Sequence, residues 1–422
     1  MAQYRNDLKI IDSGQVTTRF EVMMLDDQLT PSGTVRDSFG RLRVSEPHTL
    51  FDSTLRYTDD TRNWSTSNTA NTTVVHSANT SSMLMTVGTA NGASVIRQTS
   101  RYFLYQPGKS LLTINTGTMQ PKANVTQRFG YFDNKNGIFL EHDGTTAYIV
   151  KRSNKTGTVE ETRVPQSEWS EDKFDGTGYS KVTLDFSKTQ ILWTDIEWLG
   201  AGTMRIGFVV DGRILTAHKF HHANKITSVY MTTASLPLRY EITNTGPTAS
   251  NTTFEHICNT VISEGGHTPK VITRSASTAL TGLNMDTVAY RPLVAIRLKT
   301  GRTGGIVVPS QGIIYGLQQT PFNYKILQAA TITGGTWVSG GDESHVEYNI
   351  TATALSGGKN LLQGMFIGGT YVQPIEIDLK KFNSSYQLRT LLDGTMETFV
   401  IAAIATTNND DALASLTWEE YN

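Results

Sequence analysis

Short runs in which apolar and polar residues alternate, separated by Gly, Asn and Asp, cover most of this chain. The clearest run is M-R-I-G-F-V-V-D-G-R-I-L-T-A-H-K-F, in which Met204, Ile206 and Phe208 share one side. Alternation with a period of two is typical of a strand with one buried face. Asp211-Gly212 suits the two-residue turn of a hairpin. The pattern therefore predicts two antiparallel strands joined at this turn.

Further hairpins are predicted at Asn136-Gly137, Asp143-Gly144 and Asp393-Gly394. Turn signals recur about every ten residues along the chain, and this spacing is typical of an all-β sandwich or jelly roll. Almost no segment has the apolar period of a helix. The sequence therefore predicts an all-β protein.

Three regions follow from these signals. The first thirty residues lack both a period and a core, so 1–47 is expected to be an extended N-terminal arm that needs a neighbour to order it. The segment 64–82 is rich in Thr and Asn without Pro or Gly, which favours polar strands. The paired glycines and the proline of S-E-G-G-H-T-P-K suit a hinge. We therefore expect a jelly-roll sandwich over 48–266 and a second, smaller β-sandwich over 267–422.

The charge balance excludes several classes of partner. The 422 residues include 37 basic and 38 acidic ones, a formal net charge of −1. Such a balance gives no field that attracts nucleic acid or an anionic membrane. No apolar run approaches the roughly 20 residues of a membrane helix, and the N-terminus lacks the apolar core of a signal peptide. Cys258 is the single cysteine, so no intrachain disulfide can form. We expect a protein made in the cytoplasm that inserts into no membrane.

The segment H-K-F-H-H-A-N, 218–224, concentrates three of the nine histidines. His218 is followed by His221 at i+3 and by His222 at i+4, which are helix spacings on a predicted strand. The pattern therefore favours a strand end, with Phe220 buried and the imidazoles bonded to backbone or solvent. We expect no metal here.

The segment F-D-N-K-N-G resembles a calcium loop only in part, because Lys135 and Gly137 stand where oxygen ligands are needed. A hairpin turn accounts for it better. No phosphate-binding glycine loop, no Gly-x-Ser-x-Gly elbow and no activating partner for Cys258 are present in the sequence. We therefore expect no enzyme activity and no cofactor.

The segment W-T-D-I-E-W sets Asp195 and Glu197 two residues apart on one strand face. It is similar to the Glu-x-Asp-x-(x)-Glu strand of family-16 glycoside hydrolases, whose concanavalin-like jelly roll carries two carboxylates about 5 Å apart. Trp193 occupies the position of the first Glu, so the nucleophile is missing. Trp193, Asp195, Glu197 and Trp198 are candidate glycan contacts. The alternative is that both Trp rings pack while the carboxylates face solvent or pair with Arg205.

A longer series of sequence segments carries a more specific resemblance than these single motifs. In chain order these are R-D-S-F-G-R-L-R-V-S-E-P-H-T-L-F-D-S, Q-P-G-K-S-L-L, I-E-W-L-G-A-G-T-M-R-I-G-F-V-V-D-G, H-K-F-H-H-A-N and L-P-L-R-Y-E-I. The series resembles a family of virion structural proteins of tailed bacteriophages, and it covers about 35–266. The resemblance implies a particle component at the neck, tail, baseplate, fibre or head surface. It implies no active site.

The leader of that series supplies the candidate assembly residues Arg36, Phe39, Arg41 and Arg43. A turn followed by an alternating strand can add to the edge of a neighbour's sheet. The arginines would then pair with carboxylates across a subunit junction, or they would lie on a solvated strand face.

These observations lead to one main hypothesis and three alternatives. The main hypothesis is a non-enzymatic phage virion protein, a symmetric homo-oligomer that binds portal, neck, tail or capsid proteins and is located in the virion. The first alternative is a glycan-binding adsorption protein that contacts the host surface. The others are a capsid-surface decoration protein and a polysaccharide-degrading glycosidase.

Overall fold

The computed structural model describes residues 9–12, 15–18, 46–382 and 386–421. The chain divides into two compact units, Met1–Pro47 and His48–Asn422. In the first unit, β1 (Lys9–Asp12) and β2 (Gln15–Thr18) form an antiparallel pair. Up to residue 45 the rest of the predicted arm lies outside the described residues, and so do the assembly candidates Arg36, Phe39, Arg41 and Arg43.

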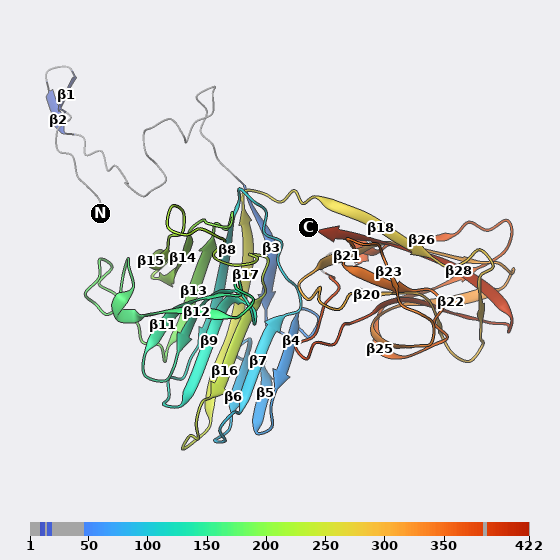
Figure 1. Ribbon diagram of the computed structural model, residues 1–422, viewed down its shortest axis with the longest axis horizontal. Helices are drawn as coiled ribbons and strands as arrows, with labels where there is room; N and C mark the ends of the chain where they lie inside the picture. The colour runs from blue at the N-terminus through green and yellow to red at the C-terminus, as the bar shows by residue number, and fades with distance from the viewer. Residues whose placement is uncertain (1–8, 13–14, 19–45, 383–385, 422) are drawn as a thin grey trace. The chain divides into compact units, whose positions relative to one another are not determined.

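Two antiparallel sheets make up the first sandwich of the second unit (Figure 1). In the described part of the chain, one has seven strands in the order β12 (Glu160–Pro165), β11 (Ala147–Ser153), β10 (Gly137–His142), β9 (Val125–Phe132), β16 (Leu238–Asn244), β7 (Ser94–Thr99) and β4 (Trp64–Asn68). The other runs β15 (Arg213–Phe220), β14 (Met204–Val210), β13 (Thr189–Ile196), β8 (Ser110–Thr118), β17 (Thr252–Glu264), β6 (Ser82–Val87) and β5 (Thr72–Ser77), with β3 (Pro47–Thr54) paired to β17 beside this path.

The alternation seen in the sequence becomes the two faces of these strands. In β8 every second residue from Leu111 to Gly117 is buried, and the residues between them are half-buried. The predicted turn at Asp211-Gly212 joins β14 to β15, with both residues at positive φ. The predicted turns near Asn136 and Asp143 join β9 to β10 and β10 to β11. The polar segment 64–82 forms β4 and β5, as predicted.

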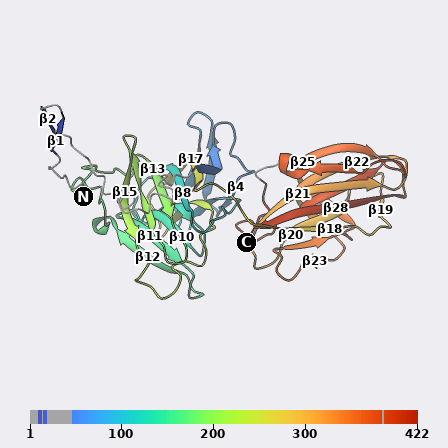
Figure 2. The same cartoon turned by 90° about the horizontal axis from the view of Figure 1, so that it is seen from above.

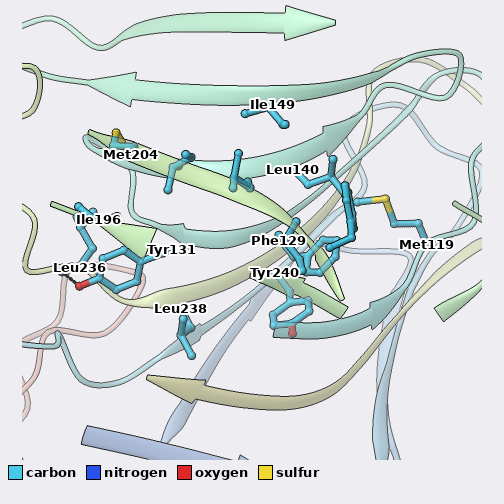
Figure 3. Close-up of a cluster of buried hydrophobic side chains, with 14 of the residues drawn as sticks. Met119, Phe129, Tyr131, Leu140, Ile149, Ile196, Met204, Leu236, Leu238 and Tyr240 are labelled. Atoms are coloured by element: carbon cyan, nitrogen blue, oxygen red, sulfur yellow. Dashed lines mark hydrogen bonds between the residues drawn. The ribbon is translucent and has the colours of Figure 1, made fainter. Parts of the chain in front are cut away.

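The core of the first sandwich lies between the two sheets (Figure 3). Phe129, Leu140 and Tyr240 enter it from the seven-stranded sheet, and Ile196 and Met204 enter it from the other sheet. Ring pairs add contacts within it, for example Phe129 stacked on Tyr240 with centroids 5.5 Å apart. Burial of such side chains is the main stabilising contribution to a sandwich of this kind.

A second pair of sheets follows the segment 265–270 (Figures 1 and 2). Within the described residues, one sheet holds β18 (Val271–Ser277), β28 (Asp410–Tyr421), β21 (Ile306–Gly316) and β26 (Ile375–Asp378), with β19 (Leu283–Met285) paired to β28. The other runs β23 (Val338–Ser339), β24 (Val346–Asn349), β20 (Arg291–Leu298), β27 (Phe399–Ala405), β22 (Pro321–Thr333) and β25 (Ala354–Ile367).

The second sandwich has a core of its own, centred on residues such as Ile296, Phe322 and Trp418. The turn predicted at Asp393-Gly394 forms. The Leu391 N–H donates to the Thr395 carbonyl at 2.8 Å, and an isolated antiparallel bridge pairs Thr390 with Met396, without longer strands beside it in the described residues. Asp393 Oδ1 also accepts the Thr395 N–H at 2.8 Å, a local contact that shapes the turn.

Helical structure is minor in the described residues: η1 (Gln166–Glu168) and α1 (Leu379–Phe382). No helix in this part of the chain has the length and apolar character needed to cross a membrane. The prediction of an all-β fold with two successive β-sandwiches, the second one smaller, is confirmed.

Candidate functional site

The segment W-T-D-I-E-W spans the end of β13 and the residues that follow it. Leu192, Thr194 and Ile196 face the core side, so Trp193 and Asp195 lie on the opposite, outer face of the eight-stranded sheet. β13 ends at Ile196, so Glu197 lies beyond the strand. The two predicted carboxylates therefore belong to one local segment, but only Asp195 is fixed by the sheet.

Asp195 is buried and held by an ion pair. Arg205 on the neighbouring β14 donates from Nε to Oδ2 of Asp195 at 2.9 Å. The other oxygen, Oδ1, is buried without a hydrogen-bond partner among the described residues. Glu197 is exposed, and its Oε2 accepts the Thr203 N–H at 3.3 Å. This matches the alternative in which Asp195 pairs with Arg205.

Both tryptophan rings of the segment are used within the fold. Trp193 is buried and donates from Nε1 to the Leu215 carbonyl at 3.1 Å. Trp198 donates from Nε1 to the Met231 carbonyl at 3.1 Å and meets Tyr105 edge to face, with centroids 6.1 Å apart. A sugar-stacking platform needs an open ring face. The Trp193 ring is buried and offers none, whereas the Trp198 ring is half-buried.

Glu264, at the end of β17, is a carboxylate that sequence reasoning did not single out. Burial raises its pKa, the Asp195 charge raises it further, and Arg205 opposes the rise. Glu264 and Asp195 come from strands flanking β8, 69 positions apart in the chain. Only the strand order brings them together, so no local motif could have revealed the pair.

The histidine segment ends β15, which stops at Phe220. Phe220 is buried, His218 Nδ1 accepts the Ser170 N–H at 3.1 Å, and His222 Nδ1 lies 2.7 Å from the Gly202 carbonyl. The His222 ring also stacks on Tyr230, with centroids 4.0 Å apart. The predicted strand end is therefore confirmed. In the described residues, no group of three or more His, Cys, Asp or Glu could hold a metal.

The loop F-D-N-K-N-G is a hairpin turn between β9 and β10, as predicted. Asp133 Oδ1 accepts the backbone N–H groups of Lys135 and Asn136, at 2.7 and 2.8 Å. That carboxylate oxygen is engaged in shaping the turn.

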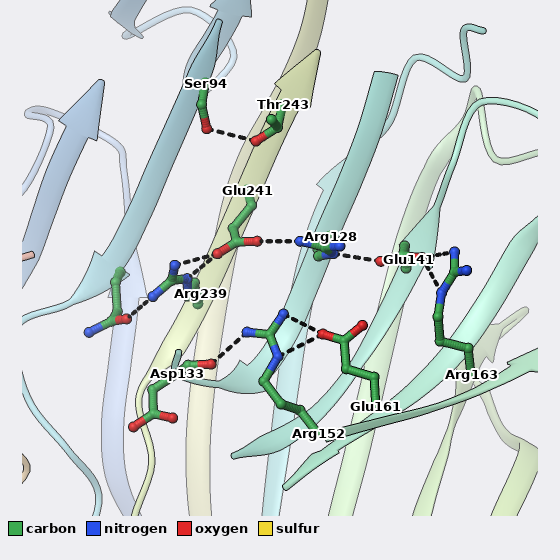
Figure 4. A network of polar contacts seen from close by, with 11 residues as sticks. Ser94, Arg128, Asp133, Glu141, Arg152, Glu161, Arg163, Arg239, Glu241 and Thr243 are labelled. Carbon is green, nitrogen blue, oxygen red and sulfur yellow. Dashed lines mark hydrogen bonds and ion pairs between the residues drawn. The ribbon is translucent and has the colours of Figure 1, made fainter. Parts of the chain in front are cut away.

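An ion-pair network crosses the outer face of the seven-stranded sheet (Figure 4). Arg128 on β9 donates to Glu141 on β10 at 2.6 Å and to Glu241 on β16 at 3.2 Å. Arg163 on β12 also pairs with Glu141, and Arg239 pairs with Glu241. A second pair joins the same face, in which Arg152 donates to Glu161 at 2.9 Å.

Four arginines engage three glutamates on this face. Burial alone would raise the pKa of Glu241, but Arg239 and Arg128 outweigh it and hold the pKa below its ordinary value. Glu141 is almost fully buried and receives bonds from Arg128 and Arg163. A buried carboxylate with two guanidinium partners is a structural ion pair, whose disruption is costly. The network therefore joins neighbouring strands of the sheet through paired side chains.

The loops at one end of the second sandwich expose large apolar side chains. We call this set the apolar end; it comprises the loop residues Leu280, Val288, Tyr371 and Val372 and, at the end of β25, Met365 and Ile367. Leu280, Val288 and Tyr371 are 90%, 85% and 99% exposed. Isolated exposed apolar residues are ordinary, whereas contiguous apolar patches are typical of interaction surfaces.

Hydrogen bonds hold these loops at one end. The Leu317 N–H donates to the Asp411 carbonyl at 2.9 Å, and the Gly369 N–H donates to the Gly316 carbonyl at 3.0 Å. Thr287 donates to the Asn408 side chain at 2.9 Å. These bonds join the loops after β19, β21, β25 and β27 where β28 begins. No sequence motif marked this surface, because its residues are spread over about a hundred positions.

The sequence matches no protein-family model, and no curated protein matches it. Solved structures resemble it only at low similarity. One is a prokaryotic β-1,3-1,4-glucanase (lichenase) from a mouse hindgut metagenome, with 10% identity over 51% of this chain and 99% of that one and a TM-score of 0.34. Another is a legume lectin-like domain from Entamoeba histolytica, with 12% identity over 47% and 89% and a TM-score of 0.29.

A third is a protein of unknown function from Shewanella oneidensis MR-1, with 11% identity over 57% of this chain and 97% of that one and a TM-score of 0.36. At these values the likenesses give no argument for a ligand or an activity.

Proposed function

We propose that this chain is a non-enzymatic structural protein of a tailed-bacteriophage particle that assembles as a symmetric homo-oligomer. The observation that carries the assembly is the apolar end of the second sandwich. The placement in a virion rests on the series of sequence phrases that resembles virion proteins.

The apolar end supplies a driving force for association. Fully burying a side chain such as Val or Leu contributes about 1.5–3 kcal/mol. The association must also offset the freedom that the subunits lose. Several apolar side chains of this end lie on loops that hydrogen bonds hold in place. Because such a surface is preorganised, the free energy gained by burial can exceed the cost of association. Closed symmetry would bury the surface on every subunit.

The paired state of the buried charges supports a structural role. Asp195 is tied to Arg205, and Glu141 and Glu241 are tied to arginines. A general acid or base needs a side chain that is free to exchange a proton and whose pKa lies near the operating pH. The glycosidase alternative therefore depends on Glu264 and Asp195, and it predicts activity on polysaccharide that is lost in the D195N variant.

The glycan-binding alternative stays a prediction. Trp193 and Trp198 are engaged in the fold, which leaves Glu197 as the exposed member of the candidate set. Saturable binding of a neutral host glycan, abolished by Glu197→Ala, would favour this alternative over pure assembly.

The particle itself provides the test of the proposed function. Mass spectrometry of density-purified particles of the phage that encodes the chain should detect it, and a tagged copy supplied in trans should be incorporated. A copy with Leu280→Ser, Val288→Ser and Tyr371→Ser should stay folded but be lost from particles. The matched control is Tyr57→Ser, Val75→Ser and Ile214→Ser, three exposed positions on the first sandwich.

Particles that lack the chain would contradict the virion role. Equal incorporation of both triple variants would contradict assembly through the apolar end.

A further inference from the structure

The strand β25 forms one edge of the six-stranded sheet, and within the described residues it pairs only with β22 (Figure 2). It has 14 residues, whereas strands in globular proteins commonly have about 5–6. The free side of an edge strand presents N–H and C=O groups that another strand can pair with, so edges are usually blunted by charges, proline or bulges. β25 contains one charged residue, Lys359, and no proline.

The two halves of β25 differ in regularity. In the first half, Gly357 and Gly358 have positive φ values of 63° and 88°, and a register shift leaves Leu361 without an opposite residue on β22. Such irregularities bend a strand and interrupt pairing at its edge. In the second half, residues 362–367 pair one for one with residues 321–326 of β22. We call residues 362–367, which carry no charge, the open edge.

Hydrogen bonds indicate which backbone groups of the open edge point away from β22. The Gly368 N–H donates to the Thr320 carbonyl at 3.0 Å, so Gly368 directs its backbone groups to the side of β22. Successive residues of an antiparallel strand direct their N–H and C=O groups to opposite sides. Gln363, Met365 and Ile367 therefore direct theirs outward. Their side chains are exposed as well, Met365 by 76% and Ile367 by 57%.

A second copy of the same strand fits this edge. A two-fold axis through Met365 places Met365 opposite Met365 of the second copy, and it places Gln363 opposite Ile367 of that copy. In this antiparallel register all three outward residues exchange backbone hydrogen bonds. No like charges meet, whereas self-pairing of the edge strand β26 would bring Glu376 and Asp378 close to their own copies. Met365 and Ile367 also belong to the apolar end, so one contact buries both features.

We propose that two copies of this chain pair through the open edges of their β25 strands, so that the two six-stranded sheets continue into each other. The inference rests on the proposed self-assembly and specifies the backbone contact through which it occurs. Backbone pairing fixes the register of the two copies, and the apolar side chains beside it add the gain from burial.

Gln363→Pro tests the backbone contact. Proline removes an outward N–H that β22 does not use, and such positions on edge strands tolerate proline. Gln363→Ala is the matched control, because it removes the same side chain, with its hydrogen bond from Asn360 at 3.0 Å, and keeps the N–H. In sedimentation of the full chain, Gln363→Pro should weaken the two-fold contact about tenfold, while Gln363→Ala should associate like the wild type. Equal association of the two variants would overturn the proposal.

Amide hydrogen exchange of the wild-type chain provides a second test, which holds even if Gln363→Pro fails to fold. The monomeric reference is the diluted chain or the variant with Leu280→Ser, Val288→Ser and Tyr371→Ser. Peptides that cover the open edge should exchange about tenfold more slowly in the oligomer, because the outward amides gain acceptors. Peptides of β18, an edge strand of the other sheet, should exchange equally in both states.

The outcomes separate this inference from the proposed function. An oligomer whose open edge exchanges as fast as in the monomer would overturn strand pairing and leave assembly through the apolar end in place. A wild-type chain that is monomeric at every concentration would refute the assembly and the pairing together.

Discussion

At the scale of single residues, buried imidazoles couple the stability of the first sandwich to pH. His222 stacks on Tyr230, and its Nδ1–H donates to the Gly202 carbonyl while Lys151 Nζ lies 3.1 Å from Nε2. Burial lowers the pKa of His222 to about 4, and the hydrogen bond to Gly202, which alone would raise the pKa, only partly offsets this effect. His256 is fully buried, and burial lowers its pKa well below the ordinary value. Both groups therefore favour folding in their neutral form.

The sign of the pH effect follows from linkage. An unfolded histidine takes up its proton near pH 6.5, whereas folded His222 does so only near pH 4. Its stabilising contribution is present above about pH 6.5 and is lost as the pH falls towards 4. In His222→Asn, which keeps a donor for Gly202 but cannot titrate, thermal unfolding should depend less steeply on pH over this window. The matched control, His221→Asn, should keep the wild-type slope; a wild-type slope in both variants would contradict the assignment.

At the scale of elements, hairpin turns set which residues pair across the sheets. Local signals were sufficient to predict those at Asn136-Gly137, Asp143-Gly144 and Asp211-Gly212, because turn residues act on their own backbone. The strand order within each sheet could not be predicted, since β9 pairs with both the adjacent β10 and the distant β16. Such pairing depends on which buried faces fit together in space. The juxtaposition of Asp195 with Glu264 was missed for the same reason.

The two hairpin glycines Gly137 and Gly212 should tolerate substitution very differently. Both have positive φ, 141° and 72°. A Cβ at Gly137 would lie 2.2 Å from Phe132 Cβ and 2.4 Å from Phe132 Cα, whereas a Cβ at Gly212 meets nothing within 4 Å. Gly212→Ala should cost about 1–2 kcal/mol for its backbone conformation alone, and Gly137→Ala should cost about 1–3 kcal/mol more through overpacking. Urea unfolding of both variants measures the difference, and equal losses would refute the cross-strand contact.

At the scale of the whole molecule, the chain combines two sandwiches with separate cores and exposes its apolar end on the second one. The sequence predicted the all-β fold because alternation and turns are local properties. It could not predict the apolar end, since its residues meet only after folding. The candidate glycan contact Trp193 illustrates the converse. A sequence motif specifies the residue type, but burial determines whether the ring face is accessible, and the Trp193 ring is buried.

The mass of the purified chain in solution, measured by light scattering, tests the central claim most directly. The account predicts a closed oligomer at a whole multiple of 46.5 kDa. It also predicts that Leu280→Ser, Val288→Ser and Tyr371→Ser reduce the mass to that of the monomer, while the control substitutions at Tyr57, Val75 and Ile214 leave the oligomer intact. A wild-type chain that stays at 46.5 kDa at every concentration would contradict self-assembly through the apolar end.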